Sequence, residues 1–124
     1  MADISKTPNK GDAMPGKFEL KKNKSGKFMF NLKAANGKVI LTSQAYKTKA
    51  AAKSGIKSVS TNCSKDNRFE QKISWKKEPY FVLLAANKKI IGKSETYTTK
   101  KSLLNGIASV KKNAPDAKIE DSTV

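Results

Sequence analysis

The sequence repeats itself at an offset of 51 residues, and this duplication limits the possible folds more than any other feature. The string AANGKVI at positions 34–40 returns as AANKKII at positions 85–91. In this register about 16 of roughly 35 aligned positions are identical, far above chance for unrelated segments of this composition. Two copies are too few for an open solenoid. We therefore expect them to close on each other around a pseudo-twofold axis.

Each copy begins with the pattern of three strands. In the first copy FELKK and FMFNLKA alternate apolar with polar residues, and KVILTS predicts a third strand. Asn36-Gly37 predicts a two-residue hairpin turn with positive φ at both positions. In the second copy Lys88 stands in place of the glycine. Because lysine tolerates positive φ less well than glycine, we expect that turn to be strained or differently shaped.

The hydrophobic period then becomes helical in both copies. One apolar stripe recurs at helical spacing in each: Ala52, Ile56 and Val59, then Leu103, Ile107 and Val110. Gly55 and Gly106 lie beside the stripe, where a glycine costs roughly 1 kcal/mol against alanine. We therefore expect each helix to approach the sheet closely there. Asn62 and Asn113 are typical of helix exits.

A short strand should follow each helix. The segment 68–75 (RFEQKISW) leads directly from the first copy into the second, so we expect it to serve both, with 117–121 (AKIED) as its later counterpart. Residues 1–16 contain two prolines, two glycines and little apolar content, which predicts a mobile tail. The chain thus divides into this tail, a first repeat at 17–67 and a second at 68–124, the repeats forming one globular unit.

These tandem strings resemble those of the YegP-like family of small bacterial proteins. The likeness rests on LKAANGKVILTSQAY and GIKSVSTN in the first copy, and on YFVLLAANKKIIGKSETY and GIASVKKNAPDAKIED in the second. It covers nearly everything from Gly16 onward and implies a β-β-β-α-β unit, present as tandem repeats or as a dimer of single units. It also implies exchanged C-terminal strands, and it implies no established activity. The predicted fold is α+β: two repeats forming one antiparallel sheet with two helices packed on one face.

The sequence offers few groups for catalysis. It contains no histidine, the usual proton shuttle and commonest metal ligand. Cys63, the single cysteine, therefore lacks the usual activating base, and Lys65 nearby would lower its pKa only somewhat. The ten acids show no spacing that pairs carboxylates, and there is no Gly-rich phosphate loop and no Cys/His cluster. We expect no enzyme activity, no cofactor and no metal.

The expected location is the cytoplasm. No apolar run approaches the roughly 20 residues that a bilayer span needs, so no membrane contact is expected. The start, MADISKTPNK, lacks the apolar region of a secretory signal. A lone cysteine cannot form an internal disulfide, so the fold does not depend on an oxidising compartment.

A formal net charge of +16 favours polyanionic partners. Arg68 is the only arginine, and lysine acts toward phosphate as a point charge, without the bidentate fork that reads guanine. Sequence-specific base recognition is therefore not expected. The competing interpretation is compositional: lysine-rich chains also fit an AT-rich genome, and lysines keep small domains soluble.

Two sets of residues are candidates for binding. At the predicted helix starts, exposed amides, hydroxyls and ammonium groups can together hold a phosphate or sulfate: Lys47, Thr48, Lys49, Thr99, Lys100 and Lys101. The competing interpretation, which we favour, is that the threonines are N-caps and the lysines are simply solvated.

The second set lies on the predicted open face of the sheet: Met29, Lys33, Tyr80, Val82 and Leu84. Aromatic and basic side chains on such a face can stack nucleobases and hold phosphates, whereas an apolar strip equally suits a dimer seam or a covering by the tail. For Tyr46 and Tyr97 we favour a structural role between sheet and helix.

The leading functional hypothesis is a non-catalytic binding module for an anionic partner, in particular the nucleic-acid backbone. The alternative is a protein-interaction or homodimerisation module that uses the open sheet face. A third class, an enzyme or small-ligand protein, would need a pocket that converges on Cys63 or on a helix start. We expect a monomer with internal pseudo-twofold symmetry.

Overall fold

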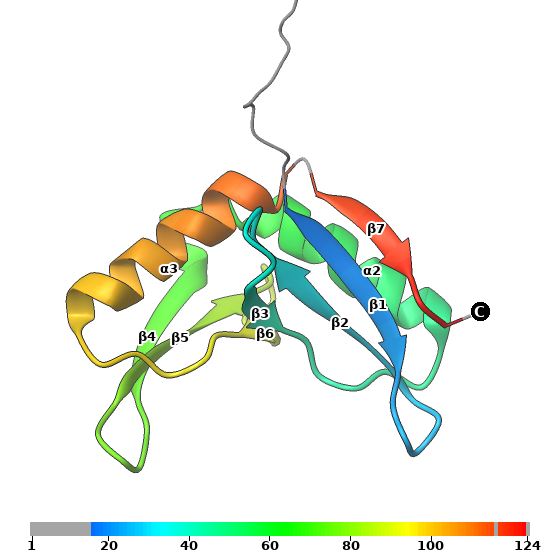
Figure 1. Ribbon diagram of the computed structural model, residues 1–124, viewed down its shortest axis with the longest axis horizontal. Coiled ribbons are helices and arrows are strands. Elements are labelled where there is room, and N and C mark those ends of the chain that lie inside the picture. Colours follow the sequence, from blue (N-terminus) through cyan, green and yellow to red (C-terminus); the bar gives the residue numbers. More distant parts are fainter. Residues whose placement is uncertain (1–15, 116, 124) are drawn as a thin grey trace, which may run out of the picture.

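The computed structural model describes residues 16–115 and 117–123, which form an α+β fold (Figure 1). The predicted tail lies outside the described residues except for Gly16. The first repeat contains β1 (Lys17–Lys22), β2 (Phe28–Lys33), β3 (Val39–Thr42) and α2 (Lys49–Asn62). The second contains β4 (Phe69–Ile73), β5 (Pro79–Leu84), β6 (Ile90–Lys93), α3 (Lys100–Asn113) and β7 (Lys118–Asp121), after a 3₁₀ turn η1 (Asp66–Arg68).

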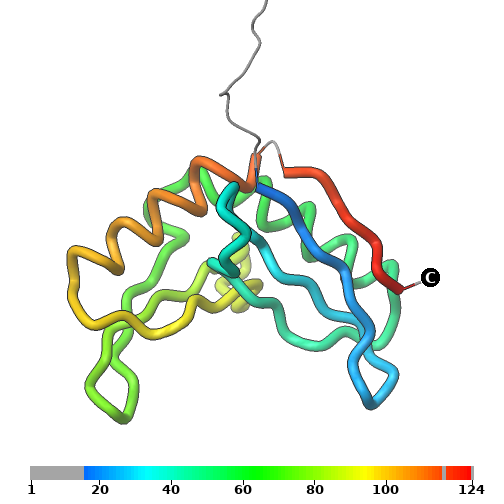
Figure 2. Tube along the Cα trace, viewed as in Figure 1, coloured from blue at the N-terminus to red at the C-terminus, as the bar shows by residue number. Residues whose placement is uncertain are grey.

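The two repeats share one seven-stranded sheet with the order β4-β5-β6-β3-β2-β1-β7. They join where β3 pairs with β6 through Thr42 and Lys93, which stand 51 positions apart and are therefore equivalent in the two repeats. A twofold axis that passes through this pair explains why β3 is paired with β6, its equivalent in the other repeat. Figure 2 shows the result, two similar halves that diverge on either side of the central strands.

The exchange of a C-terminal strand is confirmed, but in one direction and with a different polarity from that expected. β7 of the second repeat pairs with β1 of the first, and this pair is parallel, so the sheet is mixed and not purely antiparallel. No strand in the described part of the chain does the same for β4, which forms the opposite edge of the sheet. The segment that follows α2 forms β4 and pairs with β5. The connection between α2 and β5 is too short to form a second strand that could cover the β4 edge.

All four hairpins have turns of one shape, and the predicted two-residue turn at Asn36-Gly37 is wrong. Ala34 N donates to Lys38 O at 2.8 Å and Gly37 N donates to Ala34 O at 2.9 Å, which leaves three residues in the loop. Only the glycine has a positive φ, of +85°. A three-residue loop closes by a bulge residue in the left-handed region, which glycine adopts without strain.

In the second repeat the bulge residues are lysines. Lys77 and Lys88 are the only non-glycine residues of the described chain with positive φ, at +64° and +68°, where the first repeat has Gly26 and Gly37. The expected unfavourable conformation of Lys88 is thus confirmed. Lys77 shares it for the same reason.

The helices begin and end where the sequence predicted. Thr48 and Thr99 are the N-caps, and their hydroxyl oxygens accept hydrogen bonds from Ala51 N and Ser102 N. α2 packs on β2 and also on β5 and β6 of the other repeat, while α3 packs on β5 and on β3. Each helix therefore covers strands of both repeats.

The repeats share one hydrophobic core. It includes residues from both sheet halves and both helices, among them Phe30, Leu41, Val59, Phe81 and Leu103. Because each helix covers strands of both repeats, neither repeat has a closed core of its own.

Two details differ from the predicted pattern. Ile107 is only partly buried, although its equivalent Ile56 is buried. Gly16, assigned to the tail from the sequence, is buried and its amide donates to Asn113 Oδ1 at 3.0 Å. An asparagine at the helix exit thus anchors the start of β1.

Candidate functional site

Two hairpin turns extend from the same side of the molecule. The β1–β2 turn and the β4–β5 turn form the two lower tips in Figure 1, one on each half, away from the helices. The exposed lysines at the tips are Lys22, Lys24 and Lys27 on the first and Lys76 and Lys77 on the second. Both tips are therefore basic, although their lysines do not occupy equivalent positions of the two repeats.

One tip also carries the only tryptophan of the chain. The side chain of Trp75 is 88% exposed, and Lys76 Nζ lies 5.3 Å from its ring centroid. Tryptophan is highly buried on average in folded proteins, so a nearly bare indole at a turn is unusual. An exposed ring beside ammonium groups can stack on a planar ligand while the lysines neutralise its charge.

Trp75 was not predicted as a functional residue, although the repeat contained the necessary signal. The turn NKSG at 23–26 falls on SWKK at 74–77 when the offset of 51 is applied. The tryptophan therefore had to lie in a turn, where no core is available to cover it.

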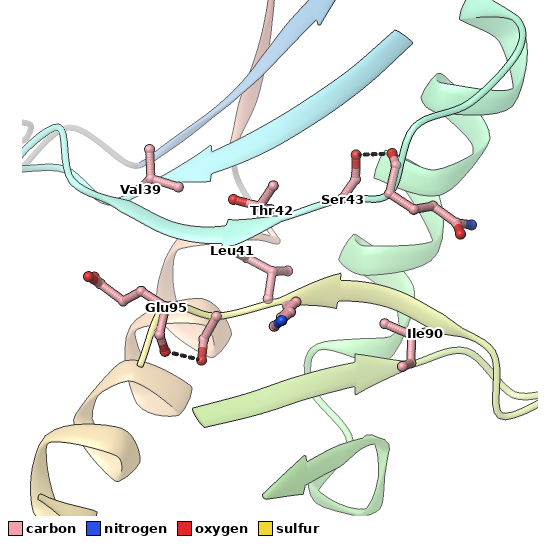
Figure 3. A pocket seen from close by; sticks show the side chains of 9 residues that line it. Val39, Leu41, Thr42, Ser43, Ile90 and Glu95 are labelled. Carbon is pink, nitrogen blue, oxygen red and sulfur yellow. Dashed lines mark hydrogen bonds between the residues drawn. The ribbon is translucent and has the colours of Figure 1, made fainter. Parts of the chain in front are cut away.

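A groove lies between the two tips, on the strands that join the repeats. It has a volume of about 410 Å³ (Figure 3). Its walls are formed by equivalent pairs from the two repeats: Val39 with Ile90, Thr42 with Lys93, Ser43 with Ser94, and Gln44 with Glu95, together with Leu41. The groove thus sits on the pseudo-twofold axis. The surface that it exposes is mostly apolar, although six of the nine lining residues have polar or charged side chains.

The serines of the groove form hydrogen bonds with the backbone of the sheet. Ser43 Oγ accepts a hydrogen bond from Phe30 N at 2.8 Å, and Ser94 Oγ accepts one from Phe81 N at 2.9 Å. Each hydroxyl also donates to the carbonyl of the next residue at 2.7 Å, as the dashed lines in Figure 3 mark. Both hydroxyls are thus engaged as donor and acceptor with backbone groups of the sheet and of the residue that follows.

The open-face candidates are less open than predicted. Val82 is only 2% exposed, so the prediction that it faces a partner is wrong for this conformation. Glu70 and Lys93 are its partners on the neighbouring strands and flank it on the same face. Tyr80 is half-buried, with Lys93 Nζ 5.0 Å from its ring centroid. Long charged side chains of the neighbouring strands thus flank the apolar residues of β5 on this face.

The other face candidates are also partly engaged. Met29 and Leu84 are half-buried. Lys33 Nζ lies 3.4 Å from Glu19 Oε2, so its charge is already compensated. The structure therefore does not bring these residues together as one basic, aromatic surface.

The helix-start candidates behave differently in the two repeats. Lys49 Nζ contacts Asp121 Oδ2 at 2.8 Å, so the first helix start already has a carboxylate from β7. Lys47, Lys100 and Lys101 are exposed, and no ion pair is recorded for them among the described residues. With both threonine oxygens used as caps, solvated lysines account for these positions without an anion.

Cys63 is unsuited to nucleophilic chemistry. It is buried, and burial raises the pKa of its thiol, which lowers the fraction of reactive thiolate. Within residues 16–115 and 117–123 no cluster of histidine, cysteine and acidic side chains is suitable for a metal ion. None of the described helices has the length and apolar character needed to cross a membrane.

Comparison with known proteins places this fold in a family. The family model of a domain of unknown function, DUF1508, matches the chain twice, at residues 23–70 and 76–121. The chain is 48% identical to the UPF0339 protein YegP of Yersinia pestis over 109 residues, which cover 88% of this chain and 97% of that protein.

The chain belongs to the UPF0339/YegP family.

Other UPF0339/YegP members agree with this assignment in sequence and structure. The UPF0339 protein MS1092 of Mannheimia succiniciproducens is 49% identical over 108 residues, covering 87% of this chain and 96% of that protein. The solution NMR structure of YegP from E. coli, described as a protein of unknown function, has a TM-score of 0.85 at 45% identity and covers 91% of this chain and 97% of that one. The resemblance seen in the sequence is therefore confirmed, and so is its tandem architecture.

Proposed function

We propose that this UPF0339/YegP protein is a non-catalytic binding module for an anionic partner, a single-stranded nucleic acid held through its phosphates. The observation that carries the proposal is the pair of lysine-bearing hairpin tips, one with the exposed indole of Trp75. The net charge of +16 supplies the long-range attraction. Base stacking on an aromatic ring contributes about 1–3 kcal/mol per base and does not require a particular base.

The proposal includes an absence of base readout. Arg68, the only arginine, is half-buried and its Nη1 lies 3.5 Å from the carbonyl oxygen of Ala85. It cannot present the bidentate fork that recognises guanine. Affinity should therefore depend on strand length and salt concentration more than on sequence.

The single tryptophan provides a direct test. Titration of the protein with an unstructured oligonucleotide should quench Trp75 fluorescence as the base stacks, in parallel with a rise in the anisotropy of a labelled strand. The logarithm of the binding constant should fall linearly with the logarithm of salt concentration. Trp75→Ala should weaken binding at least fivefold, in line with the lower end of stacking energies.

A matched pair of triple variants separates the tips from the overall charge. Lys24→Ala/Lys76→Ala/Lys77→Ala removes three charges from the tips and should reduce the salt slope by about 2, since each phosphate contact of a single strand contributes about 0.7. The control removes three exposed helix charges through Lys53→Ala/Lys57→Ala/Lys112→Ala. Equal losses in both variants, or no binding at low salt, would contradict the proposal.

The alternative, a homodimerisation or protein-interaction module on the open sheet face, has weaker support. Its central residue, Val82, is buried beneath flanking charged side chains. Binding there would first require Glu70 and Lys93 to move away.

A further inference from the structure

The pseudo-twofold symmetry is broken at one place, the outer edge of the sheet. In the first repeat β7 covers β1, whereas β4, the equivalent of β1, ends the sheet with no neighbour in the described chain. Figure 1 shows β7 along one side of the molecule, whereas on the other side no further strand of the described chain follows β4. An uncovered edge exposes a row of unpaired amide and carbonyl groups that can pair with another strand.

The covered edge shows what the strand contributes. Ile119 lies beside Phe18 and Asp121 beside Leu20 in a parallel register. Asp121 Oδ2 contacts Lys49 Nζ at 2.8 Å, at the start of α2. Ser122 N donates to Leu20 O at 2.9 Å. Glu120 Oε2 also lies 3.1 Å from Lys17 Nζ of β1. The chain thus binds its own extended segment through the half-exposed Ile119, two carboxylates and the backbone.

The vacant edge retains a cavity at the same place. A hollow of about 330 Å³ lies between β4 and α3, lined among others by Phe69, Gln71, Leu104 and Ile107. A second hollow of about 330 Å³ continues from Gln71 to Lys100, the equivalent of Lys49. Together they follow the path that β7 takes on the first repeat.

The sequences of the two helices differ along this groove. Leu104 and Ala108 of α3 stand where α2 has Lys53 and Lys57. Leu104 remains 47% exposed. The apolar wall of α3 therefore offers an added strand more apolar contact than α2 offers β7, and it stays exposed to water while the edge is vacant.

We infer that the β4 edge binds an extended peptide segment of a partner protein, which adds as a parallel strand. The segment carries an apolar residue opposite Phe69, for the hollow at Leu104, and an acidic residue two positions later for Lys100. Main-chain hydrogen bonds give such strand addition its affinity, and alternate side chains give its specificity. The excess of positive charge on the chain favours an acidic partner.

A peptide of residues 117–123 of this same chain (AKIEDST, blocked at both ends) is the probe. Added to the isotopically labelled full chain, it should shift the amide resonances of β4 and of the exposed face of α3. A peptide with asparagine in place of its aspartate, and one with the reversed sequence, should bind at least fivefold more weakly.

Two variants locate the site. Leu104→Glu removes the apolar contact and places a carboxylate beside the acidic segment, so it should weaken peptide binding at least tenfold. Ile90→Glu is its matched control, because Ile90 is also 47% exposed but lies in the central groove. Gln71→Pro should likewise block strand addition. Gln71 is equivalent to Leu20, whose carbonyl accepts from Ser122 N after β7, so the backbone amide of Gln71 points to the vacant edge and away from β5. Proline removes that amide donor without disturbing the pairing with β5.

Several results would overturn the inference. Shifts at β1 and β7 would mean that the peptide merely displaces the chain's own strand. Equal losses in Leu104→Glu and Ile90→Glu, or no binding at millimolar peptide, would rule out this site. Binding seen only after deletion of residues 1–15 would assign the edge to the chain's own N-terminal segment, and concentration-dependent dimers that Gln71→Pro abolishes would assign it to a second copy.

Discussion

The side chain of Leu41 packs directly on Gly92, the residue that occupies the equivalent position of the other repeat. A Cβ atom added to Gly92 would lie 2.5 Å from Leu41 Cδ2 and 2.6 Å from its Cγ. Residues next to a twofold axis contact their own equivalents in the other repeat. Leucine at both position 41 and position 92 would therefore produce a steric clash. One leucine and one glycine fill it together, and the sequence departs from the repeat where exact symmetry would be impossible.

Exchange of these two residues tests this packing. Gly92→Leu alone should lower the free energy of unfolding by about 1–3 kcal/mol, because overpacking strains a close-packed core. Leu41→Gly alone should cost at least about 2 kcal/mol through the cavity it leaves. The double variant Leu41→Gly/Gly92→Leu should recover most of the loss in urea unfolding. A double variant as unstable as the sum of the single ones would contradict this account.

Gly55 should resist replacement by alanine although it lies within a helix. A Cβ atom there would lie 2.5 Å from Tyr46 Oη and 2.9 Å from its Cζ. Alanine would add about 1 kcal/mol of helix propensity, but we expect a net loss of about 1–2 kcal/mol from the clash. Tyr46→Phe removes the nearest atom and should reduce that loss in a double-mutant cycle. If Gly55→Ala instead raised the free energy of unfolding, the Tyr46 side chain would have moved aside without loss of stability, and this account would be wrong.

Lys88→Gly should stabilise the protein. Lys88 has a φ of +68° at the bulge of the β5–β6 turn, where the first repeat has Gly37. Relief of the left-handed conformation should raise the free energy of unfolding by about 1 kcal/mol. Lys89→Gly is the matched control: it removes the same charge but has no positive φ to relieve, so the added freedom of the unfolded chain should lower stability. Equal effects of both variants would implicate charge instead.

Acid should weaken the attachment of β7 through Asp121. Hydrogen bonds from Lys49 Nζ and from the hydroxyl and amide of Thr123 hold the pKa of this carboxyl well below its ordinary value. A lowered pKa contributes stability that is present above the unfolded value of about 4 and is lost as pH falls below it. The unfolding temperature of Asp121→Asn should therefore decline less between pH 5 and pH 2.5 than that of the parent.

Glu95→Gln is the control for the acid experiment. Glu95 is exposed, no ion pair is recorded for it among the described residues, and the first repeat has Gln44 at its position. This variant should retain the full acid dependence. If both variants reduce the dependence of the unfolding temperature on pH equally, the Lys49–Asp121 pair is not its specific cause.

Local patterns predicted the elements well because their causes lie within a few residues. Thr48 and Thr99 cap the helices as expected, since a cap needs only the amide three positions away. The burial of Phe30 and Phe81 follows from strand alternation. The prediction failed at Val82, because its cover comes from Glu70 and Lys93 on neighbouring strands, whose register no local pattern reveals.

By itself, the sequence determined that the chain is a duplication, that each copy has three strands and a helix, and where the helices begin and end. These properties follow from periodicity, capping and repeated strings. Only the tertiary structure decided that the exchange of strands is one-sided, that β7 runs parallel to β1 and that the β4 edge stays open. The physical reason is that strand pairing depends on which distant segments reach an edge. The short connection after α2 forms only β4, whereas a second strand would be needed to cover the β4 edge as β7 covers β1.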